Sequence, residues 1–278
     1  MSDVDSGIGP IGVFDSGYGG LTILREIRKA LPEYSYIYIG DNARAPYGTR
    51  SFDVVYKFTL QAVERLFSLG CRLVILACNT ASAKALRTIQ QVDLPRLDPS
   101  RRVLGVIRPS VEVLGQLTAS GHIGVLGTPG TVKSGSYDME IAKLYPSFVT
   151  VPHACPMWVS LVEYHEADKP GADYFVRQEV DRLFAKDPDI DTVLLACTHY
   201  PLLLDKIVRY VPDGVKVVPQ GEIVARSLAD YLRRHPEMER MCGKGGDCRY
   251  FTTDSGEKFS ELATMFMGEP VNAGHIDL

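Results

Sequence analysis

Short, nearly unbroken apolar runs recur along the chain, separated by longer amphipathic stretches. Runs of this length without polar alternation are typical of strands that are covered on both faces, as in parallel sheets. They therefore predict strands in both halves of the chain. The predicted strands are residues 11–14, 36–39, 73–77, 103–106, 122–126, 147–151, 192–196 and 215–218.

The stretches between these runs carry apolar residues at helical spacing. Leu24, Ile27 and Leu31 share one face of a predicted helix, and Val176 and Val180 do so in the second half. Strands that alternate with helices in this way predict a doubly wound α/β fold with mostly parallel sheets.

Two pairs of passages echo each other. Residues 65–82 read RLFSLGCRLVILACNTAS, and residues 182–201 read RLFAKDPDIDTVLLACTHYP. Before them, IGVFDSG at 11–17 is echoed by IGVLGTPG at 123–130. Because the echoes occur in the same order, they indicate a duplicated unit. We expect two pseudo-symmetric α/β domains with the active site between them.

The remainder after residue 218 is too short to form a domain of its own. We therefore expect it to pack back on the first half. This predicts one domain from residues 1–105 plus 217–278 and a second from 106–216. The segment's predicted elements are a helix at 223–233, a loop at 238–249, a strand at 250–252 and a helix at 257–267.

Composition narrows the functional class. The 278 residues are 45% hydrophobic and 23% charged, with a net charge of -4, which argues against a nucleic-acid partner. No apolar run approaches membrane-spanning length, and residues 1–10 lack the features of a signal peptide. We expect a cytoplasmic protein without a membrane partner, in which the six cysteines are thiols.

Polar residues cluster at the predicted strand ends. In open α/β sheets, ligands bind at the carboxyl ends of the strands. The sequence therefore predicts a site built from these strand-end segments. They are residues 15–17, 41–48, 78–80, 128–131 and 197–199.

Two cysteines stand out among the six. Cys78 and Cys197 occupy matched positions, each after a predicted strand and at the start of a predicted helix. Backbone amides and the helix dipole at such a position lower a thiol pKa, so we expect reactive thiols. Cys71 and Cys155 are interpreted as buried apolar residues. Residues 242 and 248 are interpreted as free thiols in a Gly-rich loop rather than a metal site.

Other thiol chemistries fit less well. A phosphatase loop needs an arginine six residues after the cysteine, where this chain has Lys84 and Leu203. A single Cys–His pair of Cys197 and His199 would leave Cys78 without a role, and alternate residues of a strand point to opposite faces. Nucleotide-binding glycine loops are absent from the sequence. Two facing thiols suit proton removal on one face of a carbon and delivery on the other.

Read together, these phrases resemble those of glutamate racemases, in the aspartate/glutamate racemase family. The resemblance extends over nearly the whole chain and keeps the order of the phrases. They are GVFDSGYGGLT (12–22), GDNARAPYG (40–48), ACNTAS (77–82), GVLGTPGTV (124–132), CPMWVSLVE (155–163), ACTHYPLL (196–203) and, more weakly, FTTDSGEKF (251–259).

The resemblance implies a set of site residues. Cys78 and Cys197 would be the catalytic acid/bases, the first acting on the D-enantiomer and the second on the L-enantiomer. Asp15, His199 and Glu163 would support the thiols. The substrate-binding set implied by the resemblance is Asp15, Ser16, Pro46, Tyr47, Gly48, Asn79, Thr80, Thr198 and His199.

The resemblance also implies the wider function. The expected activity is cofactor-independent interconversion of L- and D-glutamate, without a metal, by a homodimer that supplies D-glutamate for peptidoglycan. The chain departs from the family pattern at Arg108, where an acid is usual, and at 217–222, which lacks an aspartate often found there. Trp158 and Ser160 also replace the usual residues.

Two alternatives remain open at this stage. One is a racemase of the same fold that acts on aspartate or another amino acid. The other is a non-catalytic binding or regulatory protein, since some family members are reported to influence DNA gyrase. The complete set of Cys78, Cys197, Asp15 and His199 favours a catalyst.

Overall fold

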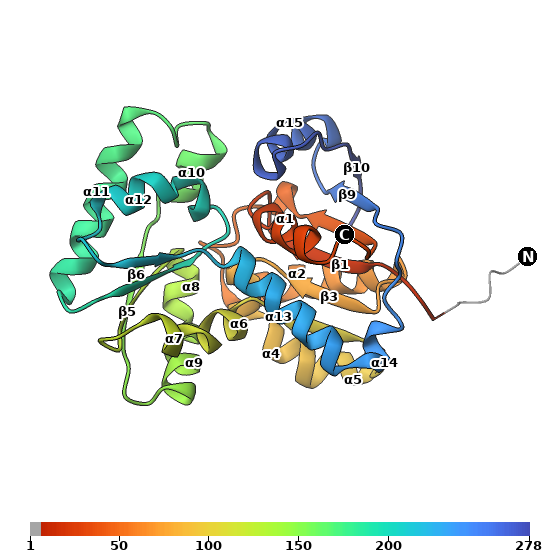
Figure 1. The fold of residues 1–278 in the computed structure, drawn as a ribbon. Helices are drawn as coiled ribbons and strands as arrows, with labels where there is room; N and C mark the ends of the chain where they lie inside the picture. The colour runs from red at the N-terminus through yellow and green to blue at the C-terminus, as the bar shows by residue number, and fades with distance from the viewer. Residues whose placement is uncertain (1–6) are drawn as a thin grey trace, which may run out of the picture.

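Two parallel β-sheets organise the chain in a computed structural model that describes residues 7–278 (Figure 1). The first sheet has the strand order β10-β9-β2-β1-β3-β4 and the second β6-β5-β7-β8. Neighbouring strands are parallel in both, which confirms the predicted fold class. The strands are β1 (Ile11–Asp15), β2 (Tyr36–Gly40), β3 (Leu73–Leu76), β4 (Arg102–Gly105), β5 (His122–Gly127), β6 (Val149–Ala154), β7 (Thr192–Ala196), β8 (Lys216–Val218), β9 (Cys248–Thr252) and β10 (Ala273–His275).

Helices cover both faces of each sheet. In β1, Ile11 and Val13 pack in one apolar cluster and Phe14 in another, because successive side chains of a strand point to opposite faces. The helices are α1 (Leu21–Ala30), α2 (Phe52–Ser68), α3 (Asn79–Lys84), α4 (Leu86–Thr88), α5 (Leu94–Leu97), α6 (Ile107–Glu112), α7 (Leu114–Leu117), α8 (Pro129–Ser134), α9 (Ser136–Leu144), α10 (Trp158–Glu163), α11 (Pro170–Lys186), α12 (Leu204–Tyr210), α13 (Gly221–Arg234), α14 (Pro236–Glu239) and α15 (Gly256–Met267).

The strand order repeats between the sheets. The succession β2-β1-β3-β4 of the first sheet corresponds to β6-β5-β7-β8 of the second. The echoed sequences fall on matching strands, since IGVF lies on β1 and IGVL on β5. Cys78 follows β3, and Cys197 directly follows the matching strand β7. The duplication seen in the sequence is therefore also present in the topology.

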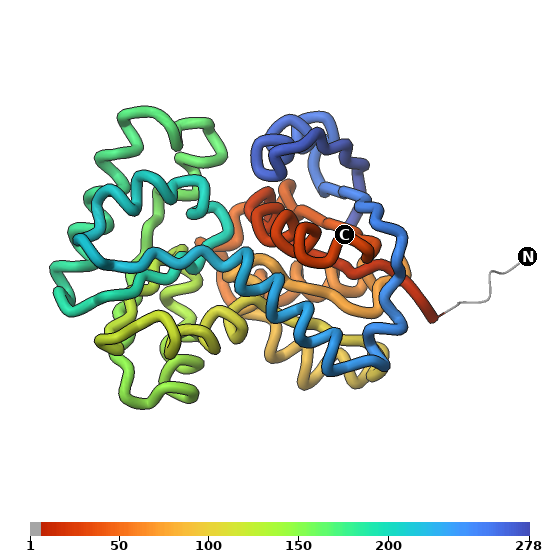
Figure 2. The backbone as a smooth tube through the Cα atoms, viewed as in Figure 1, coloured from red at the N-terminus to blue at the C-terminus, as the bar shows by residue number. Residues whose placement is uncertain are grey.

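The chain returns to the first sheet after β8. Figure 2 shows it passing from one half of the molecule to the other and back, ending beside the half in which it began. There β9 pairs with β2, β10 pairs with β9, and α13 packs on α1. The division into 1–105 plus 217–278 and 106–216 stays a domain proposal. Its boundary at 217 falls inside β8, which belongs to the second sheet, and its residues 1–6 lie outside the described part of the chain.

Some predicted bounds differ from the observed ones. The predicted strand at 147–151 is observed as β6 at Val149–Ala154, because pairing with β5 continues through Pro152. Proline is tolerated there because β6 lies at the sheet edge. Strand β10 was not predicted, since its sequence Ala-Gly-His lacks an apolar run. Within residues 7–278, no helix combines the length and apolar character needed to cross a bilayer.

Candidate active site

A cavity of about 250 Å³ opens where loops from the carboxyl ends of both sheets meet. It is smaller than the roughly 300–1,000 Å³ typical of pockets for drug-sized ligands, so it suits a small metabolite. Every site residue implied by the family resemblance lines it except Asp15. The lining residues that were predicted are Ser16, Pro46, Tyr47, Gly48, Cys78, Asn79, Thr80, Glu163, Cys197, Thr198 and His199.

Cys78 caps the N-terminus of α3. Its sulfur accepts a hydrogen bond from the amide of Ala81 at 3.4 Å and lies 3.3 Å from Ser16 Oγ. Burial, followed by the nearby Asp15 carboxylate, raises the pKa of Cys78 to about 12. The sequence-based expectation of a lowered pKa is wrong for this thiol, because desolvation outweighs the two hydrogen bonds. Cys78 is therefore held as a protonated thiol at neutral pH.

Cys197 lies in the turn after β7, beside a histidine that is itself paired with a carboxylate. Its sulfur is 3.9 Å from His199 Nδ1, and His199 Nε2 is 2.8 Å from Glu163 Oε1. Residues 197 and 199 do not point to opposite faces, contrary to the prediction from strand alternation, because β7 ends at Ala196. The predicted helix start at Cys197 was also wrong, since a 3-10 turn begins only at Tyr200.

His199 is fully buried, yet its pKa is raised to about 10. Desolvation lowers the pKa of the imidazole, but hydrogen bonds to Cys197 and Glu163 raise it by more. His199 is therefore cationic at neutral pH and places a positive charge beside the Cys197 sulfur. Opposite charge stabilises a sulfur that becomes negative, so Cys197 has a built-in partner for its thiolate.

Asp15 lies beneath the cavity rather than on its wall. It is fully buried, and its Oδ2 accepts a hydrogen bond from the amide of Gly17 at 2.9 Å. Burial raises the pKa of this carboxyl, and the nearby His199 opposes the rise. Direct contact of Asp15 with substrate stays a prediction. Its influence on Cys78 is electrostatic.

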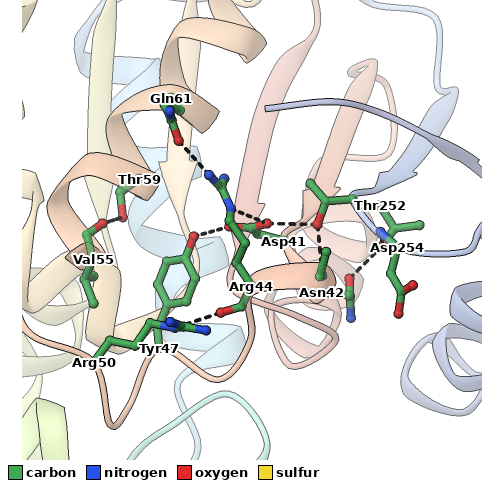
Figure 3. A network of polar contacts seen from close by, with 12 residues as sticks. Asp41, Asn42, Arg44, Tyr47, Arg50, Val55, Thr59, Gln61, Thr252 and Asp254 are labelled. Carbon is green, nitrogen blue, oxygen red and sulfur yellow. Dashed lines mark hydrogen bonds and ion pairs between the residues drawn. The ribbon is translucent and has the colours of Figure 1, made fainter.

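The loop after β2 is stabilised by hydrogen bonds to the Asp41 carboxylate (Figure 3). The Tyr47 hydroxyl donates to Asp41 Oδ2, Arg44 Nε donates to both carboxylate oxygens, and Thr253 Oγ1 donates to Oδ1 at 2.8 Å. Tyr47 thus directs its hydroxyl to Asp41, while Pro46, Tyr47 and Gly48 line the cavity. Sequence reasoning missed this supporting role of Asp41 and Thr253, although both lie in the phrases it had identified.

Hydroxyl groups join the two halves at the cavity. Thr80 Oγ1 lies 3.1 Å from Thr128 Oγ1 and 3.1 Å from Thr131 Oγ1. Thr128 had been placed at a strand end by the sequence, and it lines the cavity. Cys155 also lines the cavity while remaining buried, a position that its interpretation as a core residue did not include.

The charged groups of the site are few. Among the described residues that line the cavity there is no lysine or arginine, so His199 is the cationic side chain there. Among residues 7–278, the side chains grouped closely enough to hold a metal are His122, Asp187 and Asp189, and none of these lines the cavity. The cavity thus presents thiols, hydroxyls and amides, a set suited to proton transfer on a small polar substrate.

Comparison with known proteins agrees with this geometry. Residues 12–228 match the family model described as Asp/Glu/Hydantoin racemase. The chain is 40% identical over 267 residues to a glutamate racemase of Ruegeria sp. (strain TM1040), covering 92% of this chain and 96% of that protein. A glutamate racemase isoform from Bacillus anthracis has a similar solved structure, with TM-score 0.88, 34% identity and coverage of 97% of this chain and 98% of that one.

A second solved structure is similar at nearly the same level. It is the glutamate racemase from Francisella tularensis in complex with D-glutamate, with TM-score 0.84, 30% identity and coverage of 98% of this chain and 97% of that one. These matches confirm the resemblance identified from the sequence.

Proposed function

This chain belongs to the Asp/Glu/Hydantoin racemase family, and we propose that it interconverts L- and D-glutamate without a cofactor. The observation that carries the proposal is the pair Cys78 and Cys197, which follow matching strands of the two sheets and line one cavity. Inverting a stereocentre requires a base on one face and an acid on the other. A duplicated fold that brings one thiol from each half supplies both.

In the L-to-D direction, Cys197 acts as the base. Its thiolate takes the α-proton, and the electron pair left on carbon accepts a proton from the Cys78 thiol on the opposite face. The products are D-glutamate, a Cys197 thiol and a Cys78 thiolate, so charge and protons balance. The D-to-L direction reverses each transfer. His199 stabilises charge at Cys197, and the Ser16 hydroxyl lies next to Cys78.

Hydroxyls and amides would hold the substrate. Ser16, Thr80 and Thr198 offer hydroxyl groups in the cavity, and Asn79 offers an amide. Glutamate carries two carboxylates and one ammonium. Because no lysine or arginine is among the described lining residues, neither side chain would repel the substrate ammonium there. The names of the similar racemases support glutamate rather than aspartate as the substrate.

The proposal is tested by incubating purified protein with L-glutamate in deuterated water without added cofactor. The α-proton is followed by NMR and the enantiomers by optical rotation. Loss of the α-proton together with decay of the rotation is the expected result. Aspartate reacting in place of glutamate would overturn the substrate, and exchange with no amino acid would favour a binding protein.

We also propose that the reaction supplies D-glutamate for peptidoglycan synthesis and that the protein acts as a cytoplasmic homodimer. Similar glutamate racemases from bacteria support the first statement. The six free cysteines are consistent with a reducing compartment. Growth of a D-glutamate-requiring strain without D-glutamate, when this chain is expressed, tests the cell-wall role. Light scattering of the purified protein tests the dimer.

A further inference from the structure

Gln220 lies where the chain passes from β8 to α13, and its side chain is buried. Its Oε1 accepts a hydrogen bond from Asn79 Nδ2 at 2.7 Å. Its Nε2 donates to Ser110 Oγ and to the Tyr137 hydroxyl, each at 2.7 Å. Gln220 therefore links a cavity-lining residue after β3 to residues on α6 and α9.

Every hydrogen bond in this network has one possible direction. Ser110 Oγ donates to the carbonyl of Val106 at 2.7 Å, so toward Gln220 it can only accept. Gln220 must then present its amide nitrogen to Ser110 and its oxygen to Asn79. Asn79 in turn presents its nitrogen to Gln220, and its Oδ1 accepts from the Tyr137 hydroxyl at 2.5 Å.

This arrangement fixes the orientation of Asn79. Its oxygen and one of its two N–H hydrogens are used inside the protein, which leaves one N–H for the cavity that it lines. Asn79 also directly follows Cys78 in the chain. Whatever holds the Asn79 amide therefore acts at the wall of the active site.

We propose that Gln220 is a positioning residue for substrate binding, which it serves by holding the Asn79 amide in one orientation across the junction of the two halves. The proposal rests on the proposed racemase function. Gln220 accepts one of its hydrogen bonds and donates the other two. Here the network needs an amide, not a carboxylate.

A carboxylate at position 220 would have no hydrogen to donate. Ser110 and Tyr137 would both have to turn their hydroxyls toward it. If Tyr137 did so, the Asn79 oxygen would lose its donor, and the Asn79 side chain would be held by one hydrogen bond instead of two. A protonated acid restores one donor, so the defect of a Gln220→Glu variant depends on pH.

The test compares Gln220→Glu with the wild type and with Gln220→Met, which matches the glutamine in length and carries no charge. Racemisation of glutamate is measured from about pH 6 to 9, a range in which a buried glutamate can titrate. We expect KM of Gln220→Glu, relative to wild type, to rise at least about tenfold toward alkaline pH and to recover toward acid pH, with a smaller change in kcat. The Gln220→Met defect should not vary with pH.

A second readout does not need activity. The melting temperature of Gln220→Glu relative to wild type should fall as pH rises, because the buried acid ionises only at a cost to the fold. A KM ratio that stays flat with pH, beside a lowered melting temperature, would overturn the positioning role and leave a structural one. A difference in melting temperature between Gln220→Glu and wild type that does not change with pH would overturn the network itself. If wild type does not racemise glutamate, the proposed function fails, and the melting data still decide whether the network requires an amide.

Discussion

His199 Nε2 lies 2.8 Å from Glu163 Oε1, and both residues line the cavity. The pair joins the turn after β7 to the last residue of α10. Because Glu163 and Cys197 together keep the buried imidazole protonated, the site holds a positive charge without a lysine or arginine among its described lining residues. Glu163 thus sets the charge beside Cys197 without contacting the sulfur itself.

The first prediction concerns Glu163→Gln. The pKa of His199 is raised from 6.5 to about 10, so its contribution to stability is complete below about pH 6.5 and is lost as pH rises through about 10. Removing the Glu163 charge lowers that pKa. As pH rises, we expect the variant to lose activity at a lower pH than wild type does. Its free energy of unfolding should also be smaller than that of wild type, by an amount that shrinks toward pH 10. pH–rate profiles and melting curves measure both effects.

The control for this variant is Glu166→Gln, which removes an exposed carboxylate paired with Lys169 at the surface. Exposed pairs of this kind contribute about 0–1 kcal/mol to stability, so its profile should match that of wild type. If both variants behave alike, the His199–Glu163 pair does not set the charge of the site.

The second prediction separates the roles of the two thiols. L- and D-glutamate have equal free energy, so kcat/KM must be equal in both directions for any variant, and rates of turnover alone cannot assign the faces. In deuterated water, we expect Cys78→Ala to exchange the α-proton of L-glutamate without racemising it. Cys197→Ala should do the same with D-glutamate. Racemisation should fall by about 10²–10⁴ in each.

Cys242→Ser is the matched control, because Cys242 is buried and donates to the carbonyl of Met238, away from the cavity. Serine can keep that hydrogen bond, so racemisation should stay at the wild-type rate. Full racemisation by either alanine variant would exclude the two-thiol mechanism. Exchange of the opposite enantiomers would reverse the assignment of the faces.

The third prediction concerns Asp41, whose carboxylate accepts from Tyr47, Arg44 and Thr253. Asp41→Asn puts an N–H against donors, so we expect a loss of about 1–3 kcal/mol in the free energy of unfolding and a raised KM. Tyr47→Phe removes only one of these bonds and should have a smaller effect on both. A Tyr47→Phe variant with the larger rise in KM would show that its hydroxyl serves the substrate directly. Urea unfolding and steady-state kinetics measure the two quantities.

The fourth prediction compares two glycines. A Cβ at Gly19 would lie 2.2 Å from Thr198 Oγ1 and 2.5 Å from His199 Nδ1, so Gly19→Ala must displace the turn that carries His199. Displacements of about 1 Å in a catalytic site can cost about 100-fold in rate, and we expect kcat to fall by that order. Gly171 lies in α11, and no atom lies within 4 Å of a Cβ added there. Gly171→Ala should therefore keep full activity and raise the free energy of unfolding by up to about 1 kcal/mol. Equal activity of the two variants would contradict the close packing behind His199.

The sequence by itself determined the alternation of strands and helices and the duplication. Apolar runs such as the one in β3 predict buried strands because a parallel strand is covered on both faces. Local sequence also placed Cys78 and Cys197 at the carboxyl ends of strands, where open α/β sheets bind their ligands. The hydroxyl-bearing residues near these strand ends, such as Ser16 and Thr198, completed a pattern whose family the comparisons confirmed.

Only the tertiary structure decided the ionisation of the site and the residues that support it. The pKa of Cys78 depends on burial and on Asp15, and that of His199 depends on Glu163, which is distant in sequence. No local pattern encodes such shifts, because desolvation and charge act through space. The same holds for Gln220, whose partners come from three separate segments. The chain's local pattern fixes which groups reach the cavity, and long-range packing fixes what charge and orientation they have there.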